Sequence, residues 1–215
     1  MSLVKELEAK RTIERQQLFE AMSNYLRNLG IDCILATEPS TDSFGGTIDE
    51  PVIKLKGQNV DGIHLVSTDY ISCGMQGSIS RFVYDVILEK KLTGKTGKLL
   101  KVKTKSIKEK KLAGLFGGQI ISINWIGRDL AELLNNDPYL SKILLDCAKS
   151  KGNPEFRVHA RMPLTVAIIG PRFVEPQKII ELLNLGSKEQ FEECVFGFKI
   201  CDRIAKHIRQ LVGSW

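Results

Sequence analysis

Apolar positions near the start of the chain follow a helical period. Leu18, Met22, Tyr25, Leu26 and Leu29 recur at three- and four-residue spacing, so they share one face of a helix. Charged residues of both signs fill the other positions, and Gly30 can adopt the left-handed conformation that ends a helix. The pattern predicts an amphipathic helix over residues 2–29.

Between residues 31 and 126 the period changes to that of strands. Apolar or alternating runs bounded by turn residues predict about six strands, over residues 31–36, 51–56, 63–67, 81–88, 98–106 and 119–126. The polar, acidic segment 37–50 is expected to be a long surface loop, and residues 94–98 a plain β-turn.

Helical spacing returns after Arg128. Asp137 and Pro138 combine an N-cap residue with a proline in the first turn, which predicts a helix that begins there and ends near Lys149. Two strands over 156–161 and 164–169, a short helix over 175–183 and a last helix over 188–212 are expected to follow. The last helix buries a stripe formed by Phe191, Val195, Phe198, Ala205, Ile208 and Val212.

Strands that cluster instead of alternating with helices favour an α+β fold. We expect a mainly antiparallel β-sheet of about six strands, preceded by one helix and followed by helices, a short β pair and a C-terminal helix. A single α+β domain over residues 1–215 is expected, with a subdivision into 1–150 and 151–215 as the alternative, because residues 149–154 break the helical pattern.

Composition and cysteine usage narrow the class of protein. A hydrophobic share of 43% and a charged share of 26% are ordinary for a globular chain. The charged first residues contain no apolar segment of a signal peptide, and no run is long enough to cross a bilayer. Five widely spaced cysteines favour reduced, buried thiols. Together these features predict a soluble, cytoplasmic protein without membrane insertion.

The most distinctive chemistry is a lysine-rich stretch. Residues 90–111 hold ten lysines, and Lys101, Lys103 and Lys105 alternate with Leu100 and Val102. The candidate ligand-binding residues are Lys98, Lys101, Lys103, Lys105 and Lys108. They could bind phosphate groups on a small ligand or on nucleic acid. A solvated strand face, on which lysines deter edge-to-edge pairing, is the alternative.

An enzyme is the rival hypothesis, namely a hydrolase near Cys73 or the acidic segment Glu38–Glu50. Cys73 could be a nucleophile with His64 or His159 as its base. Alternatively, Glu50 and Asp61 could bind a metal with Lys54 as an electrostatic stabiliser. The chain lacks the spacing of a zinc site, so no resident metal and no cofactor is predicted, and no catalytic residue is assigned.

The leading hypothesis is therefore a non-enzymatic binding or interaction module for an anionic partner, a phosphate-bearing ligand or a nucleic acid. A homo-oligomer or a subunit of a larger assembly is a third alternative, in which the N-terminal helix or Trp215 forms the interface.

Overall fold

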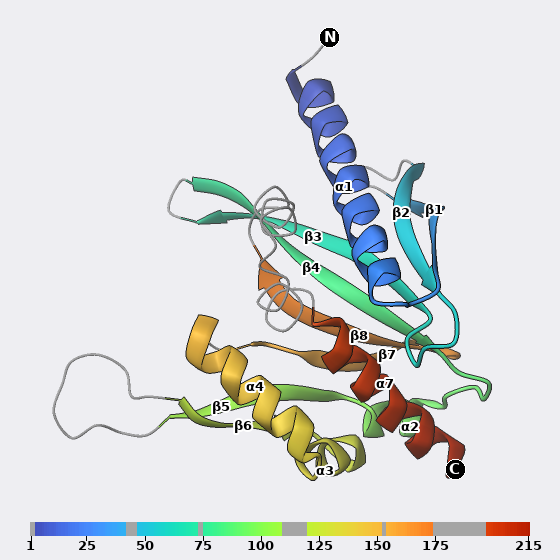
Figure 1. Ribbon diagram of the computed structural model, residues 1–215, viewed down its shortest axis with the longest axis vertical. Helices are drawn as coiled ribbons and strands as arrows, with labels where there is room; N and C mark the ends of the chain where they lie inside the picture. The colour runs from blue at the N-terminus through green and yellow to red at the C-terminus, as the bar shows by residue number, and fades with distance from the viewer. Residues whose placement is uncertain (1–2, 42–46, 73–74, 109–119, 152–153, 174–196) are drawn as a thin grey trace, which may run out of the picture.

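One antiparallel sheet forms the centre of the computed structural model (Figure 1), which describes residues 3–41, 47–72, 75–108, 120–151, 154–173 and 197–215. The strands are β1 (Cys33–Thr41), β2 (Thr47–Leu55), β3 (Gly62–Ser72), β4 (Met75–Ile87), β5 (Val102–Lys108), β6 (Ile120–Ile126), β7 (Arg157–Met162) and β8 (Thr165–Phe173). The helices are α1 (Leu3–Asn28), α2 (Gly94–Leu99), α3 (Asp129–Asn135), α4 (Pro138–Lys151) and α7 (Phe198–Gly213).

The fold is α+β, as predicted, but the sheet has eight strands instead of about six. Their order is β1-β2-β3-β4-β8-β7-β5-β6. The predicted separate β pair is the β7–β8 hairpin, which lies inside the sheet and pairs with β4 on one side and β5 on the other. Val158, Val166 and Ile168 are fully or almost fully buried, so this hairpin suits a central position.

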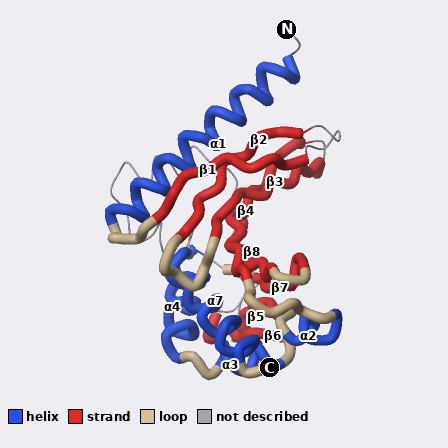
Figure 2. The backbone as a smooth tube through the Cα atoms, turned by 90° about the vertical axis from the view of Figure 1, so that its right-hand side faces the viewer, coloured by secondary structure: helices blue, strands red, loops and turns tan. Residues whose placement is uncertain are grey.

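The core lies on one face of the sheet. The pairing register aligns Ile63 with Tyr84, Tyr84 with Ile168, Ile168 with Val158 and Val158 with Val102. Paired residues share a face, and all five belong to one buried apolar cluster that also contains residues of α1, α3, α4 and α7. Figure 2 shows these helices along the sheet. The opposite face is therefore turned away from them.

The last helix is held against the β2–β3 turn by polar contacts. Arg209 donates to the backbone oxygens of Asn59 and Ile87 at 3.0 Å, and to Asp61 Oδ2 at 2.6 Å. Asp202 accepts from the backbone N–H groups of Asn59 and Val60. Phe198, Ala205, Ile208 and Val212 are buried, which confirms that part of the predicted stripe. Phe191 and Val195 lie outside the described residues.

The predicted N-cap of α4 is confirmed. Asp137 Oδ1 accepts from the N–H groups of Tyr139 and Leu140, while Oδ2 accepts from Arg203 Nε at 2.5 Å and His207 Nε2 at 2.8 Å. Burial on its own would raise the pKa of Asp137. The hydrogen bonds from Arg203, His207 and the Leu140 backbone outweigh burial and lower that pKa to about 2. Asp137 therefore joins α4 to α7.

Three local predictions are wrong. Most of the expected loop 37–50 is strand, because Thr37–Thr41 and Thr47–Glu50 pair in the β1–β2 hairpin, and only residues 42–46 lie outside the description. Residues 94–98 belong to helix α2, so Lys98 lies on a helix and not on a strand. Leu29 is 43% exposed, because Gly30 turns the chain there, whereas Leu18, Met22, Tyr25 and Leu26 are buried.

Among the helices that the structure describes, none is both long enough and apolar enough to cross a membrane.

Candidate functional site

The face of the sheet turned away from the core is polar around strands β5 and β7. The register on this face aligns Ile169 with Arg157, Arg157 with Lys103, and Lys103 with Ile126. Lys101 and Lys105 share the face with Lys103, because side chains alternate along a strand. All three lysines are exposed and Val102 between them is buried, as the sequence pattern predicts.

A cavity of about 1020 Å³ opens at the α2 end of this face. Helix α2 and the segment that precedes it form one wall, and β5 and β7 contribute most of the remaining lining. Figure 1 shows α2 beside the ends of these strands. The lining residues are Leu92, Thr93, Gly94, Gly97, Lys98, Lys101, Val102, Lys103, Ile126, Arg157, Val158, His159, Ala160, Arg161, Pro163 and Ile169.

The ionisable side chains of this lining are basic. They are Lys98, Lys101, Lys103, Arg157, His159 and Arg161, and the lining contains no carboxylate. Within the described part of the chain, no carboxylate forms an ion pair with any of the three lysines. Positive charges that surround a concave surface raise the local concentration of anions. The lining also contains apolar side chains, among them Leu92, Ile126 and Ile169.

Helix α2 carries its own start signal. The hydroxyl of Thr93 accepts from the N–H of Thr96 at 3.2 Å, and the Thr96 hydroxyl accepts from the N–H of Thr93 at 2.8 Å. This reciprocal capping box fixes the first turn. Gly97 allows α2 to approach β7, since a Cβ there would lie 3.2 Å from the Ala160 Cβ. These local contacts position Lys98 at the cavity.

The pKa of His159 depends on burial and on the positive charges around the cavity. Burial lowers the pKa of His159, and the positive charges of Arg161 and Lys101 lower it further. A neutral imidazole is therefore favoured while the cavity contains no anion.

Arg161 is held by a chain of hydrogen bonds across the sheet. Its Nη1 lies 2.9 Å from His64 Nε2, and His64 Nδ1 lies 3.0 Å from Asp85 Oδ2. Because a guanidinium can only donate, His64 accepts at Nε2 and donates its Nδ1–H to Asp85. His64 therefore supports Arg161. No local sequence pattern predicts this contact, because the two residues are 97 positions apart.

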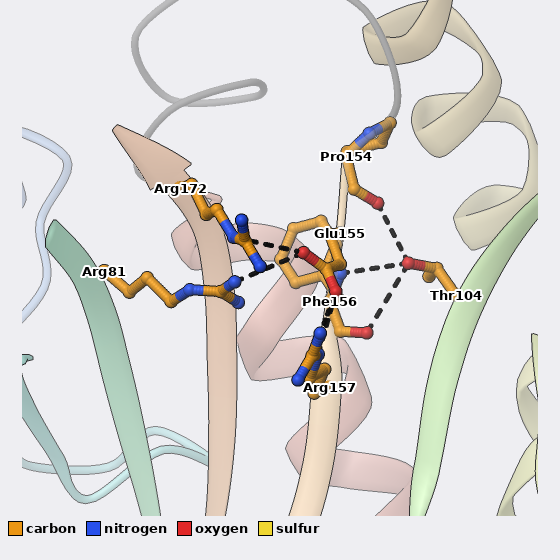
Figure 3. Close-up of polar contacts among 7 residues, drawn as sticks. All are labelled: Arg81, Thr104, Pro154, Glu155, Phe156, Arg157 and Arg172. Atoms are coloured by element: carbon orange, nitrogen blue, oxygen red, sulfur yellow. Dashed lines mark hydrogen bonds and ion pairs between the residues drawn. The ribbon is translucent and has the colours of Figure 1, made fainter. Parts of the chain in front are cut away.

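A second group of arginines surrounds Glu155 beside the cavity (Figure 3). Arg81 Nη2 lies 3.2 Å and Arg172 Nε 3.4 Å from Glu155 Oε2, while Arg157 donates to Oε1 from Nε at 2.9 Å. Burial opposes ionisation of Glu155, but the hydrogen bond and charge of Arg157, with the charges of Arg81 and Arg172, lower its pKa overall. Arg157 belongs both to this cluster and to the cavity lining.

A buried threonine fixes the segment that carries Glu155. The hydroxyl of Thr104 donates to the Pro154 oxygen at 2.9 Å and accepts from the Phe156 N–H at 3.0 Å, on either side of Glu155 (Figure 3). The N–H of Thr104 donates to the Phe156 oxygen at 3.0 Å. Thr104 thus ties β5 to the start of β7 and sets the position of Glu155.

The candidate lysines divide between two places. Lys98, Lys101 and Lys103 line the cavity, whereas Lys105 and Lys108 lie further along β5 and do not. Arg157 and Arg161 are not among the candidates that the sequence predicts, and His159 is among them only as a base. The alternation of Arg157, His159 and Arg161 with Val158 and Ala160 was a usable signal, because it matches the pattern of β5.

Of the enzyme candidates that the structure describes, Glu38, Glu50 and Lys54 lie together on the β1–β2 hairpin, where Glu38 and Glu50 are directly paired, but Asp61 lies apart from Glu50. Glu50 forms an ion pair with Arg15, and Glu38 forms one with Lys54. Asp61 forms an ion pair with Arg209 and lies in the turn that follows β2, whereas Glu50 lies near the start of β2. Cys73 lies outside the described residues. Among the described side chains, no three His, Cys, Asp or Glu residues gather as a metal site.

Comparison with known proteins gave no match to a family model, a curated protein or a solved structure.

Proposed function

We propose that this protein binds a phosphate-bearing ligand in the cavity between α2, β5 and β7. The observation that carries the proposal is the lining itself, which brings cationic side chains from separate segments together without a carboxylate. A volume of about 1020 Å³ lies at the upper end of the range typical of small-molecule sites.

Each cation has a distinct part in the proposed binding. Lys98, Lys101 and Lys103 supply mobile ammonium groups, which bind phosphate as point charges. Arg157 and Arg161 supply planar guanidinium groups that can donate two parallel hydrogen bonds to one phosphate. His159 becomes a further donor when it is protonated. These groups support binding and orientation, and they indicate no chemical step.

The first prediction concerns the lysines that line the cavity. Replacing both Lys101 and Lys103 by glutamine should weaken binding of inorganic tripolyphosphate at least tenfold, because each lysine provides a charge-assisted hydrogen bond. Isothermal titration calorimetry measures the affinity. In the wild-type protein this affinity should fall as sodium chloride is raised, because salt screens the attraction.

The matched control uses the same strand. Lys105→Gln/Lys108→Gln also removes two positive charges, but both residues lie on β5 outside the cavity lining. We expect this variant to bind within about twofold of wild type, since exposed charges away from a ligand have small effects. Equal losses in the two variants, or no loss in either, would overturn the proposal.

A further inference from the structure

The arginine cluster around Glu155 lies next to the proposed phosphate site and has a surplus of positive charge. Arg81, Arg157 and Arg172 bring three positive charges to one carboxylate. Burial lowers the pKa of Arg81, and the neighbouring charges of Arg172 and Arg157 add to that effect while Glu155 opposes it. Because the three arginines outnumber the one carboxylate, the cluster keeps a net positive charge and attracts a further anion.

Two of the three arginines are accessible. The side chains of Arg157 and Arg172 are 47% and 53% exposed, whereas Arg81 is 16% exposed and Glu155 is 29% exposed. Arg172 lies at the edge of the cluster, with its Nε 3.4 Å from Glu155 Oε2. Arg81 and Glu155 thus form the inner part of the cluster, and Arg157 and Arg172 present donors to solvent.

The cluster continues the cationic lining across the sheet. Lys103 on β5 pairs directly with Arg157 on β7, and Arg172 on β8 pairs directly with Arg81 on β4. From β5 to β4 the sheet crosses three strand spacings, roughly 14 Å. A row of cations of this length, with Glu155 already inside it, offers donors to more than one phosphate group.

We infer that the arginine cluster is a second phosphate subsite and that the ligand is a chain of linked phosphate groups. This inference rests on the proposed function, since it extends the same site. Both a nucleic-acid strand and inorganic polyphosphate have this chemistry. The described residues of the cavity lining include no phenylalanine, tyrosine or tryptophan, so the contacts follow the phosphates more than the bases.

The test compares short and long ligands on wild type and Arg172→Gln, the most exposed member of the cluster. Fluorescence anisotropy competition should show affinity rising from thymidine monophosphate to a ten-residue oligothymidylate. Arg172→Gln should weaken the long ligand about threefold to fivefold and leave the monophosphate unchanged. The slope of log affinity against log salt for the oligonucleotide should fall by about 0.7 in magnitude.

Lys142→Gln is the matched control, because it removes one exposed charge from helix α4 on the other side of the sheet. It should bind both ligands as wild type does. Inorganic polyphosphate with the same number of charges separates the two sources of linked phosphates. Tighter binding of polyphosphate assigns that ligand, and tighter binding of the oligonucleotide assigns a nucleic-acid strand.

The two proposals fail in different ways. If wild type binds tripolyphosphate through Lys101 and Lys103 but affinity does not rise with ligand length, or Arg172→Gln has no selective effect, the second subsite is wrong and the cavity proposal stands. If neither phosphates nor oligonucleotides bind wild type, the proposed function itself is wrong.

Discussion

At the scale of single residues, Asp137 shows how one buried carboxylate connects distant parts of the chain. It is 4% exposed, caps α4 and accepts hydrogen bonds from two side chains of α7. A buried carboxylate is costly unless it is fully hydrogen-bonded, and this one meets that condition with four donors. Its contribution to stability depends on the ionised form.

We predict that Asp137→Asn lowers the free energy of unfolding by about 2 kcal/mol at pH 7. The folded-state pKa of Asp137 is about 2 and lies below its ordinary value of 3.8. Its stabilising contribution is therefore complete above about pH 4 and is lost as the pH falls through 2. Urea unfolding should show that the difference from wild type narrows from pH 4 downward.

Asp146→Asn is the control, because Asp146 is an exposed residue of the same helix. It should change the unfolding free energy by less than about 0.5 kcal/mol. A difference between Asp137→Asn and wild type that stays constant down to pH 2 would contradict the account of Asp137.

At the scale of elements, helix α2 depends on local contacts more than on the core, since none of its residues is buried. Its six residues are too few for a stable isolated helix, so the capping box of Thr93 and Thr96 has a large share in its stability. Because α2 forms a wall of the cavity, its order and the order of Lys98 are linked.

We predict that Thr93→Ala destabilises α2 by about 1 kcal/mol, since it removes the N-cap acceptor. The backbone N–H of Gly97 donates to the backbone oxygen of Thr93 at 2.8 Å, and it should then exchange with solvent about fivefold faster. Hydrogen exchange followed by NMR measures this rate. Thr93→Ser keeps the hydroxyl and should exchange as wild type does; equal rates in Thr93→Ala and wild type would show that the cap is unimportant.

The elements also mark what sequence patterns could predict. Strands β3 to β6 and helices α1, α3, α4 and α7 follow from apolar spacing, because each pattern is local. The polar ends of β1 and β2 have a weak strand propensity, which predicts a loop. They form strands because pairing in the hairpin overrides that propensity. Helix α2 was predicted as a turn, because two glycines in six residues favour that reading.

At the scale of the whole molecule, the candidate site results from the order of the strands. The lysines of β5 could be selected from sequence, since their alternation with buried residues is local. Their proximity to Arg157 and Arg161 could not, because it requires the β7–β8 hairpin to enter the sheet between β4 and β5. That order is fixed by pairings between residues more than 50 positions apart, such as Val102 with Val158.

The formal net charge of +6 is modest, and its distribution matters more than its size. The cavity lining gathers five of the 31 lysines and arginines without a carboxylate. If the cavity binds phosphate, the ligand must partly neutralise this charge, and the only histidine in the lining of the cavity should register the change.

NMR measurement of the pKa of His159 with and without tripolyphosphate shows whether the anion binds in this cavity. Burial, Arg161 and Lys101 hold that pKa below its ordinary value. A bound anion should raise it, and affinity should decrease as the pH rises through it. His207 is the control, because it is hydrogen-bonded to Asp137 at the α4–α7 contact and not in the cavity lining. Its resonances should be the same in both samples. A His159 titration curve that tripolyphosphate leaves unchanged would contradict binding in this cavity.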